Sequence, residues 1–276
     1  QSLLVEHDLV EVQGLFLRKE KPVLSPRKLS KDFQTNIALL GLEERSQQEE
    51  FAQKVQEFLQ GEAISFIQAQ TGIGKTYGYL LPALSLENEG GILLSVPTKI
   101  LQNQVIQEEA KRLEEIFHIS THSLKGPQNY LKLDAFHTAL EEEESNRLYT
   151  RFKMQLLVWL TETDTGDLDE IGQLYRYQQF LPNLVHDGNL HKDSLFWLED
   201  FWKRGQDKAR SCKLLVTNHA YLVTRLEDDP SLLEGRLLIL DEAQKILLTL
   251  ENLSRKTYLL TDLLDQLDQA LSREEG

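Results

Sequence analysis

The sequence predicts an α/β protein in which a parallel sheet is interrupted by a mostly helical insertion. From Ala63 onward, apolar runs of strand length alternate with helical segments, as in a parallel sheet covered by helices. A glycine-rich loop directly follows the first of these runs. The insertion is predicted from a long stretch, about 119–210, whose composition differs from that of both flanks.

The sheet is predicted to contain four buried strands. They are the apolar runs 63–67, 91–96, 213–217 and 237–240. Each run has the length of a strand, and Pro97 stops the second one. A helical segment is expected from about Lys99 to Phe117, between the second strand and the insertion.

These boundaries divide the chain into five predicted parts. The insertion holds all three tryptophans, and Glu141–Glu144 within it reads as a solvated helix face or loop. The parts are an N-terminal arm with a small strand pair (1–40), the sheet domain's first part (41–118), the insertion (119–210), the sheet domain's second part (211–250) and an amphipathic helical segment (251–276).

Composition and charge exclude several classes of protein. The net charge of −14 argues against a basic nucleic-acid-binding domain, although residues 133–200 alone hold 14 acidic and 5 basic side chains. The single cysteine, Cys212, excludes an internal disulfide and a cysteine-ligated zinc or iron–sulfur centre, and it fits a reducing cytoplasm. We find no signal peptide and no apolar run of membrane-spanning length, so no membrane partner is expected. Because the chain begins at Gln1, we expect a processed chain or an excerpt of a longer one.

The loop Gln68–Thr76, which reads Q-A-Q-T-G-I-G-K-T, predicts a nucleotide site. Gly72 and Gly74 allow backbone N–H groups to close on phosphate oxygens, at the N-terminus of the following helix. Lys75 adds a positive charge, and Thr76 can ligate Mg²⁺ through its hydroxyl. The alternative is a glycine turn with a chance lysine. Ala69 stands where the strict pattern has its first glycine.

A second motif, Asp241-Glu242-Ala243-Gln244, directly follows the last predicted strand. Ligands bind at the carboxyl ends of parallel strands, so this pair lies where a nucleotide would be. Asp241 can hold Mg²⁺, and Glu242 can orient and deprotonate the water that attacks the γ-phosphate. An Asp-Glu pair alone is more often a charged helix start, and the loop upstream is what favours the catalytic interpretation.

Together the two motifs resemble those of superfamily 2 helicases, and in particular the DinG/XPD group. Further segments agree in order over about residues 33–250. They are Arg45–Gln48, which resembles R-x-x-Q, Pro97–Gln104, which resembles motif Ia, Lys125–Leu131, which resembles K-G-x-x-N-Y-L, and Leu215–Leu222, which resembles V-x-N-H-A-x-L.

The resemblance implies a RecA-like P-loop domain that uses ATP and Mg²⁺ and holds single-stranded DNA. The implied nucleotide contacts are Arg45, Gln48, Thr71, Gly72, Ile73, Gly74, Lys75 and Thr76, with Gln48 reading adenine. The implied strand contacts are Thr98, Lys99, Gln102, Lys125, Asn129 and Tyr130. A solvated lysine is an equal reading for Lys99 and Lys125, Tyr130 can instead fill core, and His219 either lines the ligand path or packs.

The sequence departs from the group's pattern in informative places. Lys132 stands at the position of the first iron–sulfur cysteine, so no cluster is expected. This points to the cluster-free DinG-like subset, in which a DnaQ-type exonuclease often precedes the helicase in a longer chain. Gln244 replaces the last residue of D-E-A-H. An arch domain and a second RecA-like domain, which carries the arginine finger, cannot be placed in 276 residues.

We therefore predict the motor domain of an ATP-dependent DNA helicase, with Lys75, Asp241 and Glu242 as catalytic residues. The intact protein would couple ATP hydrolysis to movement along single-stranded DNA. This chain alone is expected to hydrolyse ATP poorly, because it lacks the second RecA-like domain. The alternatives are a non-catalytic nucleotide- or DNA-binding module, or another P-loop ATPase.

Overall fold

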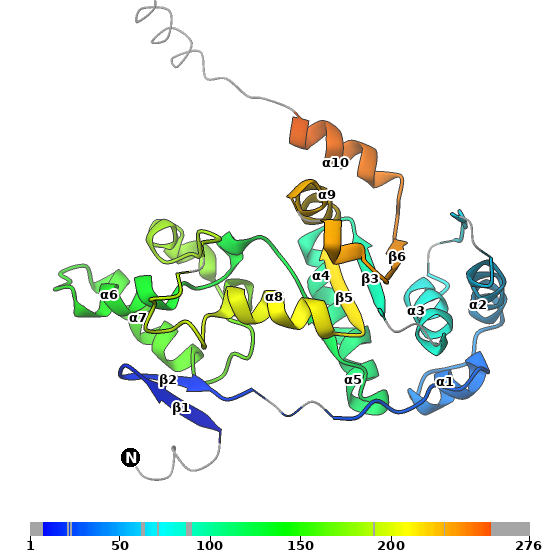
Figure 1. Cartoon of the computed structure of the whole chain (residues 1–276), viewed down its shortest axis with the longest axis horizontal. Helices are drawn as coiled ribbons and strands as arrows, with labels where there is room; N and C mark the ends of the chain where they lie inside the picture. Colours follow the sequence, from blue (N-terminus) through cyan, green and yellow to red (C-terminus); the bar gives the residue numbers. More distant parts are fainter. Residues whose placement is uncertain are drawn as a thin grey trace, which may run out of the picture.

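A parallel four-stranded sheet forms the centre of the molecule in the computed structural model, and a helical lobe extends from it (Figure 1). The structure describes residues 8–20, 22, 24–61, 64–70, 72–86, 90–189, 191–228 and 230–254. The strands lie in the order β4 (Thr121–Ser123), β5 (Leu214–Asn218), β3 (Ile92–Val96) and β6 (Leu237–Leu240). In register, Ile92 of β3 lies opposite Leu214 on one side and Leu237 on the other.

Three of the four predicted strands are confirmed, and the parallel arrangement is confirmed as well. Every residue of β3 and β5 is buried, as expected for strands with helices over both faces. The strand that the sequence did not predict is β4, which lies inside the range assigned to the insertion. Its three residues were too few to give a periodic signal.

The first predicted strand, 63–67, is wrong for the residues that the structure describes. Residues 64–70 form no strand, and Ile64 and Phe66 are 88% and 85% exposed; Ala63 lies outside the described residues. Among the described strands, β6 pairs with β3 alone, so residues 64–67 do not pair with the outer edge of β6. An apolar run becomes a strand only when a neighbour satisfies its backbone groups.

Helices that precede and follow β3 cover one face of the sheet. The predicted helix of about Lys99 to Phe117 is confirmed as a continuous run that contains a π-helical turn. The helices of this face are α1 (Phe33–Leu39), α2 (Ser46–Leu59), α3 (Lys75–Ser85), α4 (Lys99–Val105), η1 (Ile106–Ala110) and α5 (Lys111–Phe117).

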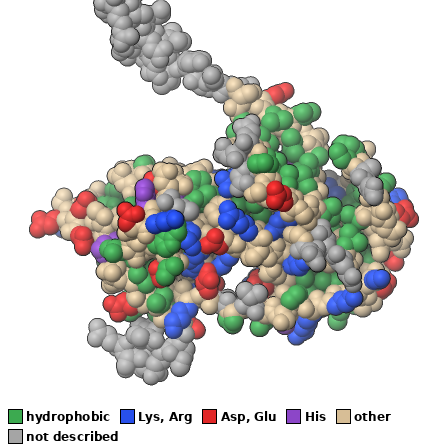
Figure 2. All heavy atoms as spheres, viewed as in Figure 1, with side chains coloured by type: hydrophobic (Ala, Val, Ile, Leu, Met, Phe, Trp, Pro, Cys, Tyr) green, Lys and Arg blue, Asp and Glu red, His purple; other side chains and the backbone are tan. Residues whose placement is uncertain are grey.

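The helical lobe corresponds to the predicted insertion. Figure 1 shows α6 and α7 at the far end of the lobe and α8 running back to the sheet. Its helices are α6 (Leu133–Glu141), α7 (Arg147–Trp159) and α8 (Phe201–Ser211), with 3₁₀ turns at Pro127–Asn129, Leu168–Glu170, Leu174–Tyr177 and Leu181–Asn183. Glu141–Glu144 is exposed as expected, and Figure 2 shows acidic side chains at that end.

Two hydrophobic cores meet at the sheet. Because side chains alternate along a strand, Leu93 and Leu215 join one core while Leu94 and Val216 join the other. The first core continues without interruption into the helical lobe, where Phe152, Trp159 and Trp202 belong to it, among others. The insertion is therefore packed onto the sheet through a shared core.

The N-terminal segment contains the predicted strand pair, β1 (Leu9–Val12) and β2 (Leu15–Arg18), which is antiparallel. Leu15 and Leu17 are 1% exposed and lie in the core of the helical lobe. The Arg18 amide donates to the carbonyl of Leu160, with N and O 3.2 Å apart. These contacts attach the pair firmly to the insertion.

The C-terminal part of the described chain contains α9 (His219–Asp228), a 3₁₀ turn (Pro230–Leu233) and α10 (Lys245–Ser254). The leucines that make the predicted segment 251–276 amphipathic, at 260, 263, 264, 267 and 271, lie outside the described residues. Leu247, Leu248 and Leu253 of α10 are at least half exposed, and Figure 2 shows the apolar surface over this helix. No helix in the described ranges is long and apolar enough to cross a membrane.

Candidate nucleotide and strand-binding site

The glycine-rich loop connects the exposed segment 64–70 to α3. Gly72 and Gly74 have φ of 83° and 81°, in the left-handed region that glycine adopts most easily. Gly74 is the residue that precedes α3, so Lys75 and Thr76 form the first turn of that helix. Four N–H groups at such a helix start have no partner within the helix and can bind an anion. The loop therefore has the local form of a phosphate cradle. Thr71 lies outside the described residues.

Arg45 and Gln48 hold the loop from the start of α2. The Gln48 amide Nε2 donates to the Gly74 carbonyl at 2.8 Å, and an Arg45 guanidinium N–H points to the Gly72 carbonyl at 3.5 Å. A Cβ at position 74 would displace the end of the Gln48 side chain, so glycine suits both this contact and the positive φ. That Gln48 reads adenine stays a prediction. The structure adds that the same side chain packs against the loop.

Asp241 lies at the carboxyl end of β6 and approaches α3 from the sheet. The Tyr79 hydroxyl donates to Asp241 Oδ2 at 3.3 Å, and the Thr76 side chain lies near enough to the same hydroxyl to lower its pKa. Burial and the nearby Asp241 carboxylate raise the pKa of Tyr79 well above its ordinary value, so the phenol keeps its proton. The two predicted metal ligands, Thr76 and Asp241, therefore converge on one hydroxyl.

This donor set fits a magnesium ion. Mg²⁺ prefers oxygen ligands and is usually held by one or two protein groups together with phosphate oxygens and water. The Asp241 carboxylate and the Thr76 hydroxyl supply such oxygens, at the helix start that would hold the phosphates. No cluster of three or more His, Cys, Asp or Glu side chains among the described residues suits a metal held by protein alone.

Glu242, the predicted catalytic carboxylate, has an unusual backbone. Its φ is 50°, which a non-glycine residue rarely adopts. The Lys245 ammonium lies 2.5 Å from Glu242 Oε2, and this hydrogen bond is the main cause that lowers the pKa of Glu242. The Lys75 charge lowers the same pKa further. Lys75, from the loop, and Glu242, from the strand end, are therefore close enough to interact.

Two of the predicted strand contacts lie on the surface at the start of α4. Thr98 and Lys99 are exposed. The Thr98 hydroxyl accepts from the Leu101 amide at 3.2 Å and so caps the helix. The Lys99 ammonium donates to Asn129 Oδ1 at 2.6 Å. This helix start presents a hydroxyl and a positive charge to solvent.

The side chains of the other four predicted strand contacts lie in the interior, and their contact with DNA stays a prediction. Gln102 and Lys125 have no exposed surface, and Tyr130 and Asn129 are 2% and 6% exposed. The Lys125 ammonium lies 2.5 Å from Asp167 and 2.8 Å from Asp169, which are both in the insertion. The spacing of residues in a motif does not show which side chains face outward, and these four are buried.

Sequence reasoning missed two residues at this site, Tyr79 and Ser95. Tyr79 is three residues after Thr76 in α3, so it shares a helix face with a predicted metal ligand. That spacing could have pointed to it. Ser95, a polar residue within an apolar strand, bonds the Asp241 amide through its carbonyl at 2.9 Å. Its only sequence signal is the isolated hydroxyl at a buried position.

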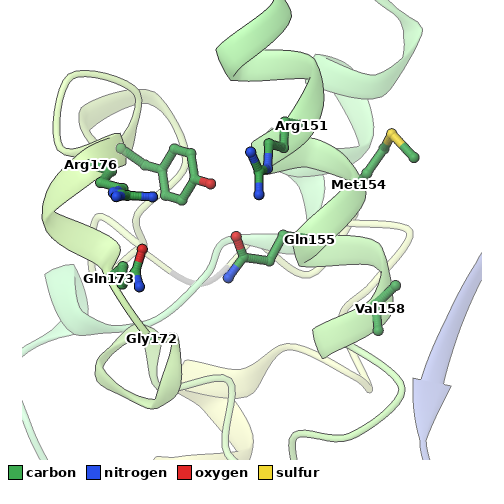
Figure 3. A pocket seen from close by; sticks show the side chains of 8 residues that line it. Arg151, Met154, Gln155, Val158, Gly172, Gln173 and Arg176 are labelled. Atoms are coloured by element: carbon green, nitrogen blue, oxygen red, sulfur yellow. The ribbon is translucent and has the colours of Figure 1, made fainter.

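A separate cavity of about 540 Å³ opens on the insertion. Figure 3 shows Arg151 and Gln155 on α7 facing Gln173 and Arg176 across it. None of its lining residues was predicted to bind a ligand. All of its lining residues lie between positions 151 and 177, so the cavity is not part of the nucleotide loop.

Comparison with known proteins agrees with this geometry. Residues 45–163 match the family model described as "DEAD/DEAH box helicase". The chain is similar to proteins named "3'-5' exonuclease DinG" from Staphylococcus saprophyticus, Bacillus subtilis and Staphylococcus aureus. The identities are 34% over 215 residues, 32% over 212 and 32% over 195. These matches cover 75%, 74% and 67% of this chain.

The same matches cover 23%, 22% and 20% of the relatives, so the chain spans about a fifth of their length. The family model covers the loop, α3 and the start of α4, and the relatives extend the likeness over most of the chain. The sheet and the paired motifs are those expected of a helicase motor domain. Residues 45–163 are thus similar to DEAD/DEAH box helicases, and most of the chain is similar to the proteins named DinG.

Proposed function

We propose that this chain is the nucleotide-binding part of an ATP-dependent DNA helicase motor. The observation that carries the proposal is the convergence of Thr76 and Asp241 on the Tyr79 hydroxyl. Two motifs 165 positions apart, at Thr76 and Asp241, are brought to one point by α3 and β6. That arrangement suits a nucleotide with its metal better than it suits a chance turn.

Each residue has a defined task in the proposed site. The loop amides and the Lys75 ammonium bind the phosphates, while Thr76 and Asp241 hold the Mg²⁺ ion. When bound, the ion neutralises charge on the phosphates and orients them. Glu242 orients the attacking water and accepts its proton after its carboxylate exchanges Lys245 for that water. Arg45, Gln48, Thr71, Gly72, Ile73 and Gly74 complete the nucleotide contacts.

Single-stranded DNA is the proposed polymer substrate. Of the six residues predicted to contact it, two have exposed side chains and four are buried. Thr98 and Lys99 keep their proposed role, since both are exposed at a helix start where phosphate binds well. Gln102, Lys125, Asn129 and Tyr130 are buried, and of these four Asn129 contacts that surface. Asn129 does so directly, through its bond to Lys99.

The surrounding protein is part of the proposal. The relatives are named as exonucleases and are several times longer than this chain, which supports a DnaQ-type exonuclease domain in the same polypeptide. We further propose a cytoplasmic protein without an iron–sulfur cluster. The proposal that there is no iron–sulfur cluster rests on Cys212 being the only cysteine in the sequence given.

Steady-state ATP hydrolysis, with and without single-stranded DNA, tests the function. This chain alone should bind Mg²⁺–ATP and turn it over slowly, because an arginine finger from a second domain is worth about 10³–10⁵ in rate. A longer protein with that domain should show DNA-stimulated hydrolysis, which Glu242→Gln should abolish. DNA-stimulated turnover at ordinary helicase rates by this chain alone would contradict the proposal that a second domain is needed.

A non-catalytic binding module is the second candidate, and the Glu242–Lys245 ion pair favours it. In a module of that kind Glu242 would stay paired and never contact water. The longer protein would then bind ATP without hydrolysing it, and Glu242→Gln would change nothing. The same assay therefore separates the two functions.

A further inference from the structure

Two residues outside the glycine-rich loop and the Asp241–Gln244 motif hold the backbone of Asp241 on both sides. The Asp241 amide donates to the Ser95 carbonyl at 2.9 Å. The Asp241 carbonyl accepts from His219 Nε2 at 3.0 Å. The Ser95 hydroxyl and His219 Nδ1 lie 2.7 Å apart, which closes the arrangement. Ser95 and His219 have no exposed surface.

The acceptors fix the direction of these hydrogen bonds. A carbonyl oxygen can only accept, so His219 Nε2 carries the proton and donates to Asp241. A neutral imidazole has one N–H, so Nδ1 accepts from the Ser95 hydroxyl. In this arrangement the Ser95 hydroxyl donates to His219 Nδ1, and His219 Nε2 donates to the Asp241 carbonyl. The ring cannot turn over without losing both bonds.

The position of His219 is fixed in turn by its neighbour in sequence. Asn218 ends β5, and its side-chain Nδ2 donates to Gln102 Oε1 at 2.8 Å. The Asn218 side-chain oxygen accepts from the Tyr221 amide at 3.0 Å and so orients the first turn of α9. Gln102 is itself bonded to Leu124, Ser123 and Val216. These hydrogen bonds therefore hold Asn218, and with it the start of α9 at His219, in place.

The bond from His219 reaches the peptide group that joins Asp241 to Glu242. Glu242 has the left-handed φ of 50°, and such a conformation persists only where the surroundings hold it. The same peptide group sets the direction in which the Asp241 side chain leaves the strand. A single donor therefore acts on both carboxylates of the motif.

We propose that His219 is a positioning residue for the metal-binding carboxylate Asp241, acting with Ser95 through the backbone. The inference rests on the proposed function, since it assigns His219 to the same magnesium–nucleotide site. His219 touches neither nucleotide nor ion. It fixes the peptide from which Asp241 reaches the metal. Partners of this kind, behind a metal ligand, typically change metal affinity by about 10–100-fold when removed.

The test measures the affinity of this chain for ADP by calorimetry, once with Mg²⁺ and once with EDTA. His219→Ala should lower the affinity in Mg²⁺ by about tenfold or more and leave the affinity in EDTA unchanged. His219→Gln places an amide donor near the position of Nε2 and should restore much of the loss. Ser95→Ala should show the same pattern more weakly, because it removes one supporting bond and no side-chain bulk at the site.

His122→Ala is the matched control, because it removes another buried histidine from the same sheet at β4. It should lower the unfolding midpoint and leave the Mg²⁺ effect intact. Equal losses with and without Mg²⁺ in His219→Ala and Ser95→Ala would overturn the inference, as would no loss at all. Wild-type protein that binds ADP with no Mg²⁺ effect would instead overturn the proposed metal site, and the inference with it.

Discussion

The nucleotide loop and the Lys125 junction are both motif segments, but they are built in opposite ways. The loop, residues 72–76, is at least partly exposed and is held by side chains that bond its backbone, from Arg45 and Gln48. The junction consists of Lys125, Asp167 and Asp169, and its ammonium is completely buried. Burial raises the pKa of Asp167 although the Lys125 charge opposes the shift.

The difference separates residues that meet ligands from residues that hold the fold. In the loop, the backbone and Lys75 remain available to an anion. At the junction, the charge that looked suited to DNA phosphate is already neutralised by the insertion. Substitutions in the loop should therefore alter binding with little effect on stability, and substitutions at the junction should do the reverse.

Lys125→Met should give the largest change. The substitution leaves the carboxylates of Asp167 and Asp169 beside an apolar chain, and breaking a buried pair by removing one partner costs about 3–5 kcal/mol. Urea unfolding measures this free energy. Lys99→Met is the control on an exposed lysine and should stay within about 0.5 kcal/mol. A stable Lys125→Met protein with weakened DNA binding would return Lys125 to the strand-binding surface.

His122, on the edge strand nearest the insertion, should give a pH-dependent effect. Burial and the Lys208 charge lower the pKa of His122 to about 4, below its ordinary value near 6.5. Between these values the unfolded chain binds a proton that the folded protein does not, so stability falls as pH is lowered from 6.5 to 4. The fully developed loss is about 3 kcal/mol.

The comparison that isolates this effect is the unfolding free energy of wild type and His122→Gln at several pH values. The difference between the two proteins should change between pH 6.5 and 4 and be constant above pH 7.5. A constant difference throughout would mean that His122 titrates normally in the folded protein.

Lys75→Ala should lower nucleotide affinity by about 10–100-fold, because a charge-assisted bond to phosphate is worth about 1.5–3 kcal/mol. Its unfolding free energy should be nearly unchanged, in contrast to Lys125→Met. Calorimetry with ADP measures the affinity, and Lys111→Ala, an exposed lysine on α5, is the control. Unchanged affinity in a folded Lys75→Ala protein would remove the phosphate-binding role of the loop.

Thr98→Ala should give the smallest change and affect both properties. Loss of the cap on α4 lowers stability by about 1 kcal/mol, and loss of the hydroxyl weakens contact with a DNA strand. Thr98→Ser keeps both functions and should behave as wild type. Fluorescence anisotropy with a labelled oligonucleotide at low salt measures the second effect. Full DNA affinity in Thr98→Ala would confine Thr98 to capping.

The sequence predicted the paired motifs and most of the sheet for a physical reason. Lys75, Thr76, Asp241 and Glu242 follow local rules, since glycine conformations and strand ends are encoded within a few residues. The fate of 64–67 was not predictable in this way, because strand formation depends on a neighbour elsewhere in the chain. Burial of Lys125 likewise depends on Asp167 and Asp169, which are more than forty positions away.

The outer edge of β6, which pairs with no other strand among the described residues, has a consequence for the chain in solution. An edge strand presents a row of backbone donors and acceptors to any strand that can align with it. Leu238 on that strand is 37% exposed, and the apolar side chains of Ile64 and Phe66 are almost fully exposed. Two copies of the chain can thus pair edge to edge. We expect light scattering to rise with protein concentration, and Leu238→Lys to suppress that rise by placing a charge on the edge.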